Sequence, residues 1–205
     1  MRFEHVLVVG AGQMGSGIAQ VAAAAGCRVS LHDEAPGATK RALETIRKSL
    51  AKLAEKGGAD PDDVLGRIEI VDDLVTADLM IEAVVEETSV KEQIFFRADQ
   101  ILPPDAILAS NTSSIPITSL AADTIRPDRV IGMHFFNPVP VLKLVEVVRG
   151  RDTSNGTVEA IVAFRRGAGE GAGAGQRLTR LRLQPDLDAV HQRGGLGAPR
   201  RGRGG

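Results

Sequence analysis

The sequence predicts an α/β fold with a doubly wound, mainly parallel sheet, on three observations. Short apolar runs alternate with longer segments of helical periodicity, which is the pattern that builds such a sheet. The first run, His5 to Val9, is apolar almost throughout, as in a central strand covered on both faces. It ends at Gly10, and an Ala-rich helical segment follows directly. No internal repeat is visible.

The other elements follow from apolar spacing and from the residues that end helices. Gly26 closes the Ala-rich segment, Gly57-Gly58 closes an amphipathic one, and Pro103-Pro104 stops a third. We expect helices at residues 14–25, 38–56 and 89–102, with others beginning near residues 115 and 155. We expect strands at residues 5–9, 29–31, 68–71, 79–84, 107–109, 130–133 and 142–148.

Composition divides the chain at about Phe164. The formal net charge is −1, yet residues 164–205 hold nine Arg, no Lys and three acids, with eleven of the 23 Gly. Such a Gly/Arg-rich segment lacks the apolar residues of a core. We therefore expect one nucleotide-binding domain at residues 1–163 and a disordered tail at residues 164–205.

The segment Gly10-Ala11-Gly12-Gln13-Met14-Gly15 joins the first strand to the first helix. Glycines at these places permit a tight turn, close approach of pyrophosphate to the backbone, and close packing of helix on sheet, which is typical of a Rossmann-like dinucleotide site. Asp33 ends the second strand, eighteen residues after Gly15, where it would accept a hydrogen bond from a ribose 2′-hydroxyl and repel a 2′-phosphate. This favours NAD over NADP. The alternatives are a glycine turn without nucleotide and an acidic helix cap at Asp33.

A histidine and a carboxylate suggest the chemistry. Gly132-Met133-His134-Phe135-Phe136-Asn137-Pro138 is followed, twelve residues after the histidine, by Glu146. A carboxylate beside the ring of His134 would fix its tautomer and raise its basicity, as removal of a hydroxyl proton requires. The pair therefore suggests alcohol oxidation, although a histidine on a strand is more often structural.

With these motifs in view, the chain resembles the L-3-hydroxyacyl-CoA dehydrogenase family, and most closely its bacterial 3-hydroxybutyryl-CoA dehydrogenase branch. The resemblance runs from Val6 to about Phe164. The matching words are GAGQMGSGIAQVAA at residues 10–23, EAVVE at 82–86, ASNTSS at 109–114 and GMHFFNPVPVLKLVEVV at 132–148. It implies NAD-dependent oxidation of L-3-hydroxyacyl-CoA, of short chain, to 3-oxoacyl-CoA in fatty acid or butanoate metabolism.

The resemblance also implies roles for three catalytic residues. His134 would take the proton of the substrate's 3-hydroxyl as hydride leaves C3 for the nicotinamide, and Glu146 would orient and stabilise the resulting imidazolium. Ser113 would form a hydrogen bond to the substrate oxygen. Ser113 and Ser114 could instead cap a helix beginning near Ile115.

Further positions match binding residues of the family. Glu86 and Asn111 fall at cofactor-contacting positions, and Ser49, Lys56 and Lys91 at positions that approach the coenzyme A portion. The alternative for the two lysines is that they are solvated helix charges.

The resemblance stops at about Phe164. Family members continue with a helical domain that supplies most of the homodimer contact, much of the acyl pocket and a site asparagine, and nothing of this kind follows here. Codons compatible with residues 184–198 can be chosen so that a frame one base later reads NRILMPFINEAVWA, as such a domain would. We therefore hypothesise a single-base frame slip just after Phe164. A helix beginning near Asn155, with Val158, Ile161 and Val162, would then lack a partner, and we expect cofactor binding at best, with little or no turnover.

Other classes are disfavoured. Cys27 is the only cysteine, so we expect neither an internal disulfide nor a cysteine-based metal site, and no metal at all. No apolar run could cross a bilayer and the first strand leaves no room for a signal peptide, so we expect no membrane partner and a cytoplasmic location. The basic tail lacks the aromatics that stack on nucleic acid, so we expect no nucleic-acid partner. A non-catalytic dinucleotide-binding module, or an NAD-binding remnant, stays the alternative to an enzyme acting on acyl-CoA.

Overall fold

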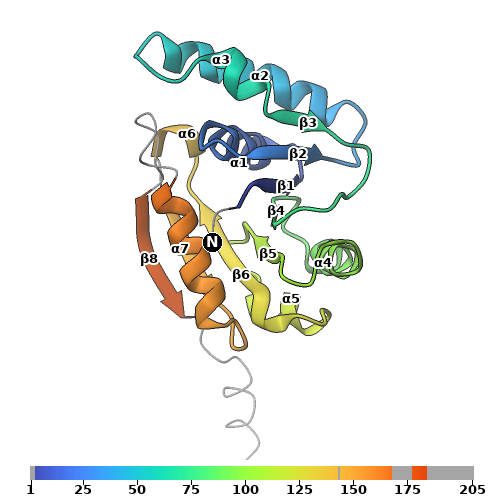
Figure 1. The fold of residues 1–205 in the computed structure, drawn as a ribbon. Helices are drawn as coiled ribbons and strands as arrows, with labels where there is room; N and C mark the ends of the chain where they lie inside the picture. The colour runs from blue at the N-terminus through green and yellow to red at the C-terminus, as the bar shows by residue number, and fades with distance from the viewer. Residues whose placement is uncertain (1–2, 143, 168–176, 184–205) are drawn as a thin grey trace, which may run out of the picture.

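The computed structural model describes residues 3–142, 144–167 and 177–183, which form one eight-stranded sheet with helices packed on it (Figure 1). The strands are β1 (His5–Val9), β2 (Arg28–His32), β3 (Ile68–Ile70), β4 (Leu79–Glu82), β5 (Ile107–Ser110), β6 (Val130–Phe135), β7 (Leu144–Arg149) and β8 (Arg177–Leu183). The helices are α1 (Gln13–Ala24), α2 (Ala38–Ala54), α3 (Pro61–Leu65), α4 (Thr88–Ile101), α5 (Ile117–Ala122), the 3₁₀ turn η1 (Pro127–Arg129), α6 (Val139–Leu142) and α7 (Asn155–Gly167).

The strand order is β3-β2-β1-β4-β5-β6-β7-β8. Each neighbouring pair is parallel except β6 and β7, which are antiparallel. The chain first builds outward from β1 to β3 and then returns to place β4 on the other side of β1. Ligands of doubly wound sheets bind beside such a reversal, at the carboxyl ends of the strands. The expected α/β fold class is confirmed.

Both faces of the sheet are covered, which explains why β1 is apolar without alternation. Val6 and Val8 belong to one buried cluster, and Leu7 and Val9 to another on the opposite face. Helices α1, α2 and α7 contribute to the first cluster through residues that include Ile18, Ile46 and Ile161. Helices α4 and α5 contribute to the second through residues that include Phe95, Ala98 and Leu120. Among the described residues, no helix is long and apolar enough to span a membrane.

The expectation that α7 lacks a partner is wrong. Val158 and Ile161 are buried against the sheet, and Val162 is partly buried beside them. The ring of Phe164 meets the ring of Phe3 edge-on, with centroids 5.2 Å apart. The helix therefore finds its apolar contacts within this domain and continues beyond the expected boundary, to Gly167.

Part of the tail also differs from the expectation of disorder. Residues Arg177–Leu183 form β8, which pairs in parallel with β7 at the edge of the sheet. An edge strand offers a row of backbone N–H and C=O groups to any extended segment, and this stretch of the tail contains neither Gly nor Pro. The remainder of the tail, residues 168–176 and 184–205, lies outside the described residues, so the expectation of disorder there stays a prediction.

Candidate functional site

Three glycines follow β1, two in the loop and one in the first turn of α1, and glycine suits each position for a different physical reason. Gly10 has a φ of +101°, which favours glycine, and a Cβ there would lie 2.6 Å from the carbonyl oxygen of Ala83. A Cβ on Gly15 would lie 1.7 Å from the carbonyl oxygen of Gly10, so α1 packs against the strand only without a side chain there. A Cβ on Gly12 would meet nothing within 4 Å. The fold therefore leaves backbone bare toward open space at the start of α1, as pyrophosphate binding requires.

A pocket of about 420 Å³ opens beside this loop, at the carboxyl ends of β1, β2 and β4. Its lining includes Gly10, Gly12 and Asp33 together with the apolar side chains of Val90 and Ile94 from α4. An apolar wall facing a glycine turn and a carboxylate suits the adenosine half of a dinucleotide. The residues present therefore fit the expected cofactor.

Asp33 holds this corner through two backbone hydrogen bonds. Its Oδ2 accepts from the N–H of Ala11 at 2.6 Å, and its Oδ1 accepts from the N–H of Ala35 at 2.8 Å. The carboxylate thus ties the end of β2 to the glycine loop. The alternative of a helix cap is wrong, because the N-cap of α2 is Gly37 and no side chain caps it.

His134 and Glu146 lie directly opposite each other on β6 and β7. His134 Nδ1 is 3.3 Å from Glu146 Oε2, and the side chains are 25% and 15% exposed. Phe136 packs on the imidazole, with ring centroids 4.8 Å apart. Because a carboxylate only accepts, the pair favours the tautomer with its proton on Nδ1, which leaves the Nε2 lone pair free to take a proton.

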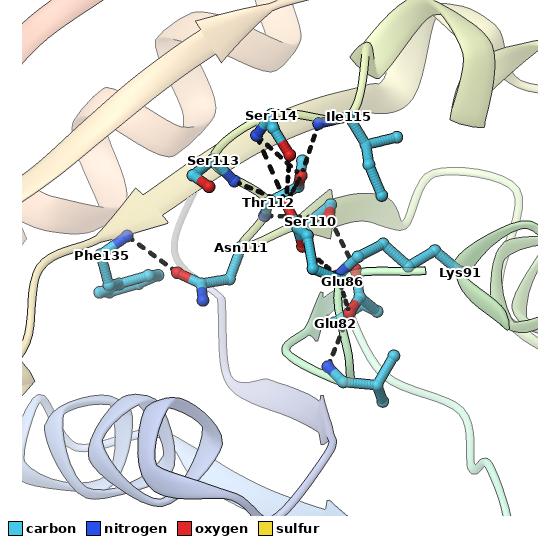
Figure 2. Close-up of polar contacts among 11 residues, drawn as sticks. Glu82, Glu86, Lys91, Ser110, Asn111, Thr112, Ser113, Ser114, Ile115 and Phe135 are labelled. Carbon is cyan, nitrogen blue, oxygen red and sulfur yellow. Dashed lines mark hydrogen bonds and ion pairs between the residues drawn. The ribbon is translucent and has the colours of Figure 1, made fainter. Parts of the chain in front are cut away.

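Asn111 connects the loop after β5 to the strand that carries the histidine. Its Oδ1 accepts from the N–H of Phe135 at 2.9 Å (Figure 2). Within the part of the chain that the structure describes, the two N–H donors of this amide have no acceptor. The sequence reasoning assigned Asn111 only to the cofactor, and the structure adds this brace beside His134.

Glu86 accepts several hydrogen bonds from the loop that contains Ser113. Its Oε1 accepts from the Thr112 hydroxyl, from the N–H groups of Ser113 and Ser114 at 3.1 and 3.3 Å, and from the Ser114 hydroxyl at 3.0 Å (Figure 2). The helix-cap alternative for the two serines is wrong, because α5 begins after Pro116 without a side-chain cap. Ser113 is exposed at this edge.

The charge of Glu86 is stabilised by these contacts. Burial raises the pKa of its carboxyl, but the hydrogen bond from Thr112, the positive charge of Lys91 and the hydrogen bonds from Lys91 and Ser114 outweigh burial. The resulting pKa is about 2, against an ordinary 4.5. Glu86 is therefore a fixed negative charge at this edge of the sheet.

Lys91 is buried beside two carboxylates. Its ammonium is 2.7 Å from Glu82 Oε1 and 3.2 Å from Glu86 Oε2, and its side chain is 1% exposed. A solvated helix charge is therefore wrong, and within the described residues the ammonium is held by two carboxylates rather than directed to solvent. Ser49 is half-buried on α2, and Lys56 is exposed just past its end. The contact of Ser49, Lys56 and Lys91 with coenzyme A stays a prediction.

Sequence reasoning missed Glu82, Ser110 and Thr112, which complete the network around Glu86 and Lys91 (Figure 2). The signal for Glu82 was present, because a carboxylate at the end of an otherwise apolar strand needs a partner.

Among the described residues, no three His, Cys, Asp or Glu side chains gather as a metal site would require.

Residues 5–172 match the family model described as 3-hydroxyacyl-CoA dehydrogenase, NAD binding domain. The chain belongs to this family. Its cofactor is accordingly NAD, as the glycine loop and Asp33 predicted. The expected resemblance is confirmed, and the match reaches beyond Phe164, where the resemblance was expected to end.

Two curated relatives and one crystal structure show how much of the family the chain spans. It is 49% identical to a probable 3-hydroxybutyryl-CoA dehydrogenase of Bacillus subtilis over 170 residues, which are 80% of this chain and 59% of that protein. It is 51% identical to the probable 3-hydroxybutyryl-CoA dehydrogenase of Deinococcus radiodurans over 159 residues, 75% of this chain and 57% of the relative. The crystal structure of (S)-3-hydroxybutyryl-CoA dehydrogenase from Ralstonia eutropha superposes with a TM-score of 0.81 at 39% identity, covering 89% of this chain and 65% of the other.

Proposed function

We propose that this chain carries the NAD-binding and proton-accepting half of a short-chain L-3-hydroxyacyl-CoA dehydrogenase, which oxidises 3-hydroxybutyryl-CoA to the 3-oxoacyl-CoA in fatty acid or butanoate metabolism. The observation that carries the proposal is the pair His134 and Glu146. The histidine lies near the carboxyl end of β6, the edge of the sheet at which the glycine loop also lies.

The chemistry needs one proton acceptor and one hydride acceptor. NAD supplies the hydride acceptor when it is bound. His134 would take the proton of the 3-hydroxyl at Nε2, and Glu146 would stabilise the imidazolium through Nδ1. The distance of 3.3 Å is longer than the roughly 2.7–2.9 Å of a charge-assisted hydrogen bond, so protonation of the ring would draw the two groups together.

The neighbouring loop would supply binding groups. Ser113 would donate to the substrate oxygen, Asn111 would contact the cofactor with its amide, and Glu86 would hold the loop in place. Ser49 and Lys56, about two helical turns apart in sequence, would meet the coenzyme A portion from the side of α2.

Turnover by this chain alone would be small. It matches less than three fifths of its two curated relatives, and the second wall of the acyl pocket, together with the homodimer contact, would come from the helical domain that the resemblance implies. Val141 and Leu142 of α6, in the connection between β6 and β7, are 64% and 42% exposed, as expected of side chains that would face such a domain. The alternative is a non-catalytic dinucleotide-binding module or remnant.

Two measurements on the purified chain test the proposal. Titration with NADH, followed by its fluorescence, should saturate, because the nucleotide half of the site is complete. NADH oxidation with acetoacetyl-CoA should be slow and should disappear in His134→Ala, while NADH binding persists. Absence of NADH binding would refute the proposal, and residual turnover unchanged in His134→Ala would favour adventitious activity over this mechanism.

A further inference from the structure

Glu82 is the most deeply buried carboxylate at this edge of the sheet. Its side chain is 0% exposed, at the carboxyl end of β4, where the other three residues are buried and apolar. It accepts hydrogen bonds from the ammonium of Lys91 at 2.7 Å, the hydroxyl of Ser110 at 2.6 Å and the N–H of Val84 at 2.7 Å. Each of its two oxygens is therefore engaged.

Stability alone is a weak reason for this arrangement. Desolvation of two charges opposes their attraction, and well-packed apolar residues of similar size are often as stable as a buried ion pair. A buried ion pair is better explained where its geometry also holds another part of the protein in position. The contacts of Lys91 show which part this is.

Lys91 connects Glu82 to the loop after β5. Its ammonium also lies 3.2 Å from Glu86 Oε2, while the other oxygen of Glu86 accepts from the Ser113 and Ser114 N–H groups. The same loop carries Asn111, whose Oδ1 accepts from the backbone beside His134. Ion pairs and hydrogen bonds thus link buried Glu82 to residues 112–114, and the backbone of this loop connects them to Asn111, which contacts the strand that bears the histidine (Figure 2).

We propose that Glu82 is a positioning residue for the nicotinamide side of the site, acting through Lys91 and Glu86 on the loop of residues 111–114. This inference rests on the proposed function. Glu82 itself touches neither cofactor nor substrate. Glu82 holds the ammonium of Lys91 in place. Lys91 in turn holds the carboxylate of Glu86, which binds the N–H groups of the loop.

The variant Glu82→Gln tests the role. Glutamine keeps the length of the side chain and an acceptor for Ser110, but it removes the charge that holds Lys91. NADH and ADP-ribose are the probes, because ADP-ribose lacks the nicotinamide and uses only the glycine loop and the adenosine pocket. We expect the Kd for NADH to rise about tenfold or more while the Kd for ADP-ribose changes less than about twofold. Amide hydrogen exchange at Ser113 and Ser114 should accelerate more than exchange in β1.

Asp99→Asn is the matched control. Asp99 and Arg126 form another buried ion pair, 2.6 Å apart and 1% and 8% exposed, between α4 and the segment after α5. Loss of this ion pair should lower stability but change the Kd values for NADH and ADP-ribose by similar factors. If Glu82→Gln does not fold, Glu82→Asp, which keeps the charge but is one methylene shorter, should show a smaller loss of the same selective kind.

The outcomes separate the two proposals. Failure of the unmodified chain to bind NADH would remove the proposed function and this inference with it. Normal NADH binding, combined with equal losses for NADH and ADP-ribose in the Glu82 variants, would overturn the positioning role alone. The positioning role would also be overturned if Asp99→Asn showed an equally large selective loss of affinity for NADH.

Discussion

His134 and Glu146 face each other across the antiparallel pair β6–β7, with Nδ1 of the ring 3.3 Å from Oε2 of the carboxylate. They are twelve positions apart in the sequence, and a turn at α6 returns the chain so that they share one face of the sheet. Directly opposite side chains of an antiparallel pair are the closest neighbours that a sheet offers. The backbone register, rather than a flexible loop, therefore sets the orientation of the imidazole.

The first prediction concerns the tautomer of His134. Glu146→Gln keeps an oxygen acceptor opposite Nδ1, whereas Glu146→Leu removes it. At about pH 9, where imidazoles are neutral, the ring should carry its proton on Nδ1 in the unmodified chain and in Glu146→Gln, and shift toward Nε2 in Glu146→Leu. Nitrogen chemical shifts of the ring measure this directly. An unchanged tautomer in Glu146→Leu would show that the carboxylate does not orient the ring.

The second prediction compares Gly12, at the N-terminal cap of α1, with Gly15, in the first turn of the same helix. Gly12→Ala should leave the melting temperature unchanged, because the added Cβ meets nothing within 4 Å, yet weaken NADH binding about tenfold or more by obstructing the phosphates. Gly15→Ala places its Cβ 1.7 Å from the carbonyl oxygen of Gly10, so it should destabilise the fold by at least about 3 kcal/mol. Thermal unfolding and NADH titration of both variants provide the comparison. Equal melting temperatures would contradict the packing argument.

The fold was predictable because its strands carry their own signal. The run Val6 to Val9 could only suit a strand buried on both faces, and the Gly and Pro positions bounded most helices. The composition of the tail was less informative about its structure. The structure placed residues 177–183 on the edge of β7, and pairing at an edge depends on which strand lies there rather than on the local sequence.

The site was less predictable where burial of charge decides it. Val90 and Ile94 of α4 are apolar and four residues apart, but they line the pocket, whereas the buried residues of the helix include Lys91 and Phe95. A lysine is buried only with a partner, and Glu82 lies on a different element. Such a pairing is a tertiary contact, which periodicity within one helix cannot reveal.

The third prediction concerns the choice of nucleotide. Asp33→Ser removes the negative charge beside the expected ribose, so the preference for NADH over NADPH should fall about tenfold or more. The hydrogen bond to the N–H of Ala11 is also weakened, so binding of both nucleotides should decline somewhat. Glu44→Ser is the control, because Glu44 is exposed on α2 and does not line the nucleotide pocket. An unchanged ratio of the two affinities in Asp33→Ser would exclude Asp33 as the discriminating group.

The fourth prediction follows from the low pKa of Glu86. Its carboxyl has a pKa of about 2 in the fold, against 4.5 ordinarily, so the ionised form is favoured by folding. The stability that it contributes is fully present above about pH 4.5 and is lost as the pH falls toward about 2. Glu86→Gln should therefore lower the free energy of unfolding at about pH 7, and this difference should shrink steadily in acid. Urea unfolding across that range measures it, with the exposed neighbour Glu87→Gln as control.

The fifth prediction concerns the coding sequence at the change of composition. If the frame slips by one base just after Phe164, the nucleotide sequence read one base later from that codon should encode a helix-rich stretch that includes NRILMPFINEAVWA. Resequencing the codons for residues 163–166 shows whether the slip belongs to the gene. A protein expressed from the restored frame should reduce acetoacetyl-CoA much faster than this chain, because it would regain the second wall of the acyl pocket and correct positioning of the substrate. A shifted frame without that stretch, or equal turnover by the two proteins, would dispose of the hypothesis.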